Sequence, residues 1–181
     1  VLEGAKSPEK PYLFIAGFSD QAFHTLPINL ISGRLPENSG EVLVPAHVAE
    51  KGGVRFRVGD TISLEIGDRV DGNRNLSQHI PYHSGTGGET LVPRSKKTYR
   101  VVGICQRPGF EEHSAPGYTL ITKADGKENT DRFSLFVTLK NPRQVKAYVS
   151  DKAGKQDYLL NDYVLRFMGI SENRLINTLL Y

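Results

Sequence analysis

The chain has 181 residues, of which 38% are hydrophobic and 24% are charged, and its formal net charge is only +3. This length is enough for one domain with a substantial core and for a lobe inserted in it. The small net charge and the lack of a dense Lys/Arg block argue against a nucleic-acid-binding surface, which needs many clustered cations.

The single cysteine and the hydropathy pattern narrow the possible classes of protein further. Cys105 has no second cysteine to pair with, and it lies in a strand-like apolar segment where a thiol acts as a small buried filler. No apolar stretch approaches the roughly 20 residues of a transmembrane helix. The chain starts at Val1 rather than at Met, so we expect a piece of a longer protein.

The N-terminal third predicts two strands and a short helix. The first ten residues are polar, which predicts a loose lead-in. A compact apolar run at residues 12–18 predicts a buried strand, and a second short strand is expected at residues 41–44. Pro45 suits the first position of a helix, which the glycines at 52–53 would end.

The middle of the chain contains one clear strand and one long connection. Residues 58–60 (Val-Gly-Asp) form a turn signal, and apolar and polar residues alternate over 61–66. Such alternation predicts a strand with one dry face and one solvated face. From residue 68 to residue 97 the chain is rich in Gly, Asn, Ser, Pro and Thr, which predicts a long irregular connection.

The last third combines strands with helices. Further strands are expected at residues 99–105, 118–122 and 133–139. Asn141 followed by Pro142 predicts a helix start, because Asn accepts from free N–H groups and Pro has none to satisfy. Gly154 would end that helix. The fold class is therefore α+β with strands dominant.

An apolar segment at residues 163–170 precedes a second helix start. Ser171 can cap a helix that begins with Glu172, and Leu and Ile recur over residues 175–180. This pattern suits either a C-terminal helix packed on the core or the first turns of a membrane helix.

The long connection also holds the candidate contact residues. They are Arg69, Arg74, His79, Tyr82, His83 and Arg94, and the Arg and Tyr side chains among them are of types common in binding hot spots. His79 and His83 have a zinc-ligand spacing for a helix, with Glu89 as a possible third ligand, but Pro81 argues against a helix there. We therefore expect a partner contact in this connection, and neither a metal nor a cofactor.

Other patterns lack a catalytic signature. Residues 85–88 (Gly-Thr-Gly-Gly) are not followed by the Lys-Ser/Thr of a phosphate-binding loop. Glu111, Glu112 and His113 are adjacent, as in many solvated loops, and no serine lies in a Gly-x-Ser-x-Gly elbow. We expect no catalytic residue and no enzyme activity in this chain.

Four segments carry a resemblance to a known family. They are residues 30–36 (Leu-Ile-Ser-Gly-Arg-Leu-Pro), 40–44 (Gly-Glu-Val-Leu-Val), 58–64 (Val-Gly-Asp-Thr-Ile-Ser-Leu) and 99–104 (Tyr-Arg-Val-Val-Gly-Ile). With the tail at residues 165–173, they resemble the extracytoplasmic, MacB-like domain of FtsX/MacB-type ABC transporter permeases. Each segment alone is a common β-turn arrangement, whereas their order and spacing together are specific. The resemblance runs from about Leu30 to the end of the chain.

The resemblance implies an architecture and a set of partners. It implies a mixed α/β membrane-proximal lobe of about residues 1–38 and 123–181, carrying an inserted, mainly β lobe of about residues 39–122. It implies a bacterial cell membrane location with this domain on the extracytoplasmic side. The implied partners are a cytoplasmic ABC ATPase reached through membrane helices outside this chain, a second permease copy, and an envelope protein, peptide or lipid-linked client. No active site, cofactor or nucleic acid is implied.

Two other functions stay open at this point. One is a small soluble β-barrel enzyme with its site in the loop at residues 79–89, which metal analysis and an activity screen would test. The other is a structural adhesion module with no motor attached.

Overall fold

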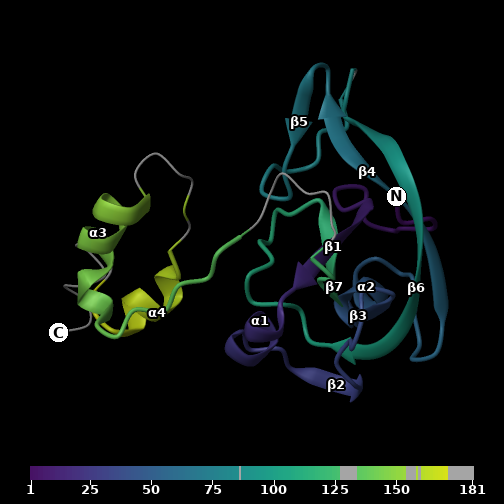
Figure 1. Cartoon of the computed structure of the whole chain (residues 1–181). Helices are drawn as coiled ribbons and strands as arrows, with labels where there is room; N and C mark the ends of the chain where they lie inside the picture. Colours follow the sequence, from purple (N-terminus) through teal and green to yellow (C-terminus); the bar gives the residue numbers. More distant parts are fainter. Residues whose placement is uncertain (86, 127–133, 154–157, 159, 171–181) are drawn as a thin grey trace. The chain divides into compact units, whose positions relative to one another are not determined.

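The computed structural model describes residues 1–85, 87–126, 134–153, 158 and 160–170, and the chain divides into two compact units, Val1–Thr130 and Asp131–Tyr181 (Figure 1). Helices occur together with a mixed sheet, which confirms the expected α+β fold class. No helix in the described part of the chain has the length and apolar character needed to cross a bilayer.

One seven-stranded mixed sheet forms the frame of the first unit. Its strands are β1 (Tyr12–Phe18), β2 (Leu30–Gly33), β3 (Glu41–Pro45), β4 (Thr61–Asp71), β5 (Arg74–Leu76), β6 (Thr90–Cys105) and β7 (Gly117–Lys123). The order across the sheet is β1-β7-β3-β6-β4-β5, and β2 pairs with β6 beside this path. Two short helices, α1 (Asp20–Thr25) and α2 (His47–Glu50), lie in the connections.

Strand β6 organises the sheet because it is long enough to pair with three other strands. Its first part runs antiparallel to β4, from the pair Val70 and Thr90 to the pair Thr61 and Arg100. Its last part pairs in parallel with β3 and antiparallel with β2. Figure 1 shows β4 and β6 curving together along one side of the unit. Segments far apart in the sequence therefore meet at the end of β6.

The core consists of two apolar clusters. The larger contains Leu2, Val42, Val44, Val48, Ile62, Tyr99, Val101, Tyr118 and Leu120, and the smaller contains Phe18, Leu43, Cys105 and Ile121. Neighbouring residues of β3 belong to different clusters, because successive side chains of a strand point to opposite faces. Cys105 is 1% exposed, in agreement with the buried filler expected from the sequence.

The first ten residues are not a loose lead-in, so that expectation was wrong. Leu2 is 5% exposed and belongs to the larger cluster. The Leu2 N–H donates to the Pro11 carbonyl at 2.7 Å, and the Lys6 N–H donates to the Gly52 carbonyl at 2.9 Å. One apolar anchor and a few backbone hydrogen bonds are enough to dock a segment whose composition is polar.

The expectation of a long irregular connection between residues 68 and 97 was also largely wrong. β4 continues to Asp71, β5 adds a short third strand, and β6 begins at Thr90. The pairing is hidden in the sequence because this part of the ribbon is exposed on both faces along much of β6, so its residues need not alternate between apolar and polar.

The strand expected at residues 133–139 is not found in the described part of that range. Residues 134–139 belong to no strand, and Leu135 is 80% exposed; residue 133 lies outside the described residues. β-propensity is strongly context-dependent, since a strand needs a neighbour that supplies hydrogen bonds and a packed face. An apolar pattern alone therefore did not decide this segment.

Short helical segments make up most of the described second unit. They are a 3-10 turn (Pro142–Gln144), α3 (Val145–Tyr148), a π-helical turn (Val149–Ala153) and α4 (Asp162–Phe167). The helix start at Asn141 is confirmed, because the Asn141 side chain accepts from the Arg143 N–H at 3.1 Å. The expected helix end at residue 154 and the expected helix from residue 172 lie outside the described residues.

The lobes implied by the resemblance stay a prediction. The boundary between the two compact units lies between residues 130 and 131, whereas the expected lobe boundaries lie at residues 38–39 and 122–123. Strand β1, from the expected membrane-proximal lobe, pairs over its whole length with β7, most of which falls in the expected inserted lobe.

Candidate functional site

The connection between β4 and β6 is organised by a buried ion pair. Arg69 lies near the end of β4 and is 8% exposed. Its Nε and Nη2 atoms donate to the two carboxylate oxygens of Glu89 at 2.7 and 2.6 Å. Its Nη1 atom also donates to the carbonyls of Ser77 and Ile80. Arg69 therefore fixes the path of the connection, and little of it is accessible to a partner.

Tyr12 joins this ion pair to the sheet. The Arg69 guanidinium lies 5.5 Å from the centre of the Tyr12 ring, and the Tyr82 ring meets Tyr12 edge-on at 5.8 Å. Burial and then the charge of Glu89 raise the pKa of Tyr12 to about 12. Tyr82 is half-buried in this contact, so its ring serves chiefly to pack the connection against β1.

The two histidines of the proposed zinc spacing have separate carboxylate partners. His79 Nδ1 lies 2.7 Å from Glu112 Oε1, and His83 Nδ1 lies 3.6 Å from Asp71 Oδ2. Glu89, the possible third ligand, is bonded to Arg69 instead. Among the described residues, no three His, Cys, Asp or Glu side chains are grouped as metal ligands. In the described part of this loop, the three residues considered as zinc ligands therefore have separate partners.

The outer surface of the connection carries the remaining candidates. Arg94 forms an ion pair with Asp68 across the ribbon, and its side chain is 70% exposed. Arg74 on β5 is exposed, as are His79 and His83. These four side chains lie where a partner could reach them, and their contact with one stays a prediction.

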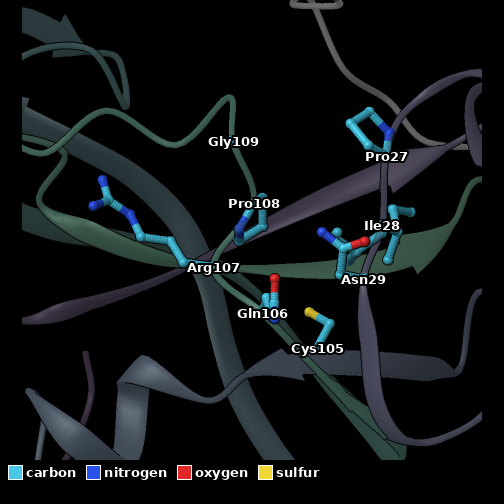
Figure 2. Close-up of a pocket in the computed structure, with 9 residues that line it drawn as sticks. Pro27, Ile28, Asn29, Cys105, Gln106, Arg107, Pro108 and Gly109 are labelled. Carbon is cyan, nitrogen blue, oxygen red and sulfur yellow. The ribbon is translucent and has the colours of Figure 1, made fainter.

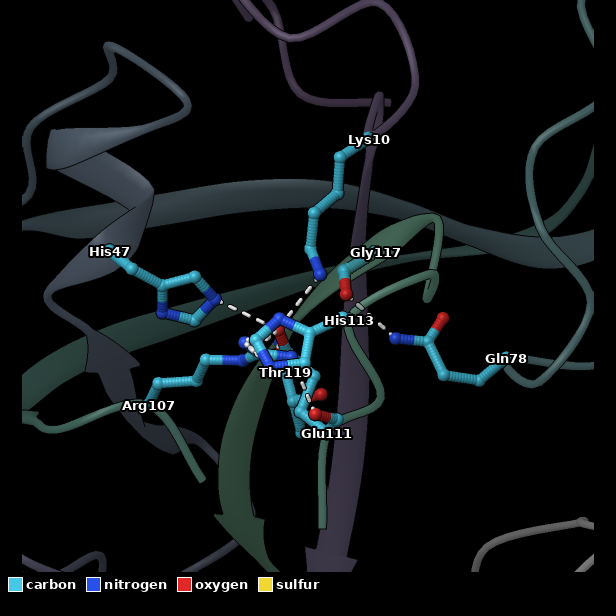
Figure 3. Close-up of polar contacts among 8 residues, drawn as sticks. All are labelled: Lys10, His47, Gln78, Arg107, Glu111, His113, Gly117 and Thr119. Atoms are coloured by element: carbon cyan, nitrogen blue, oxygen red, sulfur yellow. Dashed lines mark hydrogen bonds and ion pairs between the residues drawn. The ribbon is translucent and has the colours of Figure 1, made fainter. Parts of the chain in front are cut away.

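A second polar cluster, which the sequence did not reveal, surrounds Glu111. Figure 3 shows Lys10, His47 and Arg107 converging on this carboxylate from three separate segments. Lys10 Nζ and His47 Nε2 each lie 2.8 Å from Glu111 Oε1, and Arg107 Nε lies 3.3 Å from the same oxygen. The Thr119 N–H donates to Oε2 at 2.7 Å.

These contacts keep Glu111 ionised. Its side chain is completely buried, and burial alone would raise its pKa. Hydrogen bonds with His47 and Lys10, and then from the Thr119 N–H, outweigh burial and lower the pKa of Glu111 to about 2. Both carboxylate oxygens are occupied. The group therefore clamps the N-terminal segment, α2 and β7 together and is unsuited to proton transfer near neutral pH.

The sequence offered little sign of this cluster. Lys10 is 101 residues from Glu111, and His47 is 64 residues from it. The only local signal was the run Glu111–Glu112–His113, which we interpreted as a solvated loop. A buried clamp of this kind depends on tertiary contacts that no spacing rule encodes.

A small cavity of about 150 Å³ lies beside the single cysteine (Figure 2). Its lining residues are Pro27, Ile28, Asn29, Cys105, Gln106, Arg107, Pro108, Gly109 and Ile121. Burial, and then the charge of Glu111, raise the pKa of Cys105 to about 12. The thiol therefore stays protonated, whereas a nucleophile or metal ligand would need the thiolate.

A second cavity, of about 260 Å³, lies where the family-like turns meet. It is lined by Gly33, Arg34, Val58, Gly59, Arg100, Val101 and Val102. Arg34 forms a two-bonded ion pair with Glu41, at 2.8 and 2.5 Å, so its guanidinium is held in one position. This cavity marks a junction of turns rather than a set of reactive groups.

No protein-family model matches the chain, and no curated protein matches it. A functional assignment therefore rests on the sequence pattern and on the geometry described above.

Proposed function

We propose that this chain is the extracytoplasmic domain of a bacterial ABC transporter permease of the FtsX/MacB type. The observation that carries the proposal is the position of the four family-like segments. They contribute β2, β3, β4 and the end of β6, and the first three of these strands all pair with the fourth. The four segments, which are separated along the chain, thus meet at the end of β6 in the structure.

Backbone hydrogen bonds hold the turns of the first three segments against the fourth segment. The turn after β2 bonds to β6 through the Arg34 N–H and the Val102 carbonyl, at 2.9 Å. The turn before β3 bonds through the Gly40 carbonyl and the Arg100 N–H, at 2.8 Å. The third turn bonds twice to Val101, through Gly59 and Asp60. All three turns therefore converge on residues 100–102.

Arg34 and Glu41 explain the spacing between the first two segments. Besides its two bonds to Arg34, the Glu41 carboxylate accepts from the Glu37 N–H at 2.9 Å. This closes residues 34–41 into a rigid loop. A Gly-Arg-Leu-Pro segment followed at this distance by Gly-Glu is thus a structural unit, which supports the resemblance on physical grounds.

The charged groups suit a mechanical role better than a chemical one. Among the described residues, two carboxylates are fully buried: Glu89 is bonded to Arg69, and Glu111 is bonded to the Lys10–His47–Arg107 group. In the proposed permease, the sheet transmits ATP-driven motion of the membrane helices to an envelope protein, peptide or lipid-linked client. A separate cytoplasmic ATPase supplies the energy, and two permease copies work together.

The full-length protein that contains this chain tests the proposal. Expressed with its neighbouring genes, it should enter the membrane fraction and co-purify in detergent with an ABC ATPase. A full-length protein that is soluble and has no such companion would refute the proposal. Metal analysis and an activity screen of the same sample test the enzyme alternative, with His83→Ala as the diagnostic variant.

A further inference from the structure

The last described helix presents a small apolar face to solvent. In α4 and the residue that follows it, Val164, Phe167 and Met168 are 48%, 91% and 46% exposed. Their spacing of three and four residues puts them on one side of the helix. Leu165, in contrast, is 8% exposed. We call Val164, Phe167 and Met168 the α4 apolar face.

Hydrogen bonds define both ends of this helix. At the start, the Asn161 side chain accepts from the Val164 N–H at 3.3 Å. At the end, the Ile170 N–H donates to the Leu165 carbonyl at 2.8 Å, around Gly169 with φ of 66°. This is the closing bond of a Schellman motif, which favours glycine at the left-handed position. The exposed phenyl ring of Phe167 thus belongs to a capped helix and not to a fraying end.

We propose that the α4 apolar face lies against the surface of a lipid bilayer that contains anionic headgroups. The inference rests on the proposed function, which places a membrane next to this end of the domain. Residues 175–180, which follow α4 closely in the sequence, are rich in Leu and Ile. Aromatic and aliphatic side chains on one face are how short helices lie in a membrane interface.

The charge of the second unit and the small area of the α4 apolar face favour a lipid surface over a second copy of the chain as the binding partner. Lys and Arg outnumber Asp and Glu in residues 131–181, and Lys140 and Arg143 are exposed in the second unit. An excess of cations attracts an anionic surface and repels an identical copy. Three side chains also cover far less than the roughly 800 Å² that each partner buries in a standard protein interface.

The lack of tryptophan in the natural chain permits a direct test. A Phe167→Trp variant of the 181-residue protein has a single tryptophan, on the α4 apolar face, which can be excited selectively in the presence of the eight tyrosines. Adding phosphatidylcholine vesicles with phosphatidylglycerol should shift its emission to the blue, and brominated lipids should quench it. Leu135→Trp is the matched control, because Leu135 is an exposed apolar residue of the same unit outside α4. An unchanged spectrum of the Phe167→Trp variant, or an equal response from both variants, overturns the proposal.

A second variant measures how much the α4 apolar face contributes to vesicle binding. Phe167→Ser with Met168→Ser should weaken vesicle binding by about tenfold, because it removes two apolar anchors. Omitting the anionic lipid should weaken binding of the unsubstituted protein in the same direction. Circular dichroism checks that the double variant is folded, and the fluorescence of the Phe167→Trp variant decides alone if it is not. Sedimentation that shows a dimer abolished by the same substitutions, without vesicle binding, identifies a second copy as the occupant and overturns the proposal.

The vesicle assay separates this inference from the proposed function. A full-length protein that spans the membrane with its ATPase, combined with no fluorescence change in the Phe167→Trp variant, refutes the lipid contact alone. A clear fluorescence change in that variant, combined with a full-length form that has no membrane helices, refutes the permease function alone.

Discussion

Arg69 and Glu89 form a buried ion pair with two hydrogen bonds between residues 20 positions apart in the sequence. The pair joins the end of β4 to the residue just before β6, so it closes the outer end of the ribbon that these strands form. The connection that the sequence predicted to be irregular and to contact a partner is therefore tied to the sheet by its own charged residues.

Removing one partner of this pair should destabilise the protein strongly. Arg69→Ala leaves the Glu89 carboxylate buried without a counter-charge, which typically costs about 3–5 kcal/mol. Urea denaturation at pH 7 measures the free energy of unfolding. Arg94→Ala is the matched control, because it breaks an exposed pair in the same ribbon and should cost less than about 1 kcal/mol. Equal losses for the two variants would show that the buried pair has no special role.

The Glu111 cluster predicts a specific loss of stability in acid. The folded-state pKa of Glu111 is about 2, below its ordinary value of 4.5, so ionised Glu111 stabilises the fold above about pH 4.5. That contribution, on the order of 3 kcal/mol, should disappear as the pH falls from about 4.5 to about 2. Urea denaturation at several pH values across this range measures how the free energy of unfolding changes with pH.

The Glu111→Gln variant isolates this share of the pH dependence. Arg34 holds the pKa of Glu41 at about 2 as well, so other carboxylates contribute to the acid limb. The variant should be less stable at pH 7 and should lose less stability between pH 4.5 and pH 2. A variant with the same acid slope as the natural protein would contradict the assigned protonation state.

Two glycines of the family-like turns should differ in their tolerance of alanine. Gly33 has φ of 80°, and a methyl group there would lie 2.2 Å from the Val102 carbonyl oxygen. Gly59 has φ of 100°, but a methyl group there would meet open space. Gly59→Ala should therefore cost only backbone strain, about 1–3 kcal/mol, whereas Gly33→Ala should cost clearly more. Thermal unfolding of both variants checks the order, and the reverse order would contradict the packing at β2 and β6.

Sequence patterns predicted the elements whose cause is local. The alternation over residues 61–66 gave the first half of β4, and Asn141 gave a helix cap that the structure confirms. α1 was not recognised, although Ser19 caps it and Asp20 lies in its first turn. Its six residues are too few for an amphipathic period to emerge from a mixed composition.

The wrong predictions share a physical cause, because each of these segments depends on contacts with residues far away in the sequence. Docking of Leu2 and Lys10 depends on segments far along the chain, so the N-terminal residues looked unstructured. Of the expected site residues, Arg69 and Tyr82 proved to be packed, because they contact Glu89 and Tyr12. The apolar pattern at residues 134–139 gave no strand, since strand formation also needs a neighbour.

The central claim is that this domain lies outside the cytoplasm of the cell that makes it, and cysteine labelling of the full-length protein tests it most directly. Asn73 is exposed in the turn between β4 and β5, whereas Cys105 is buried with a pKa of about 12 and should not react. Asn73→Cys should react with a membrane-impermeant maleimide in intact cells. Labelling at residue 73 that occurs only after the cells are broken would contradict the account.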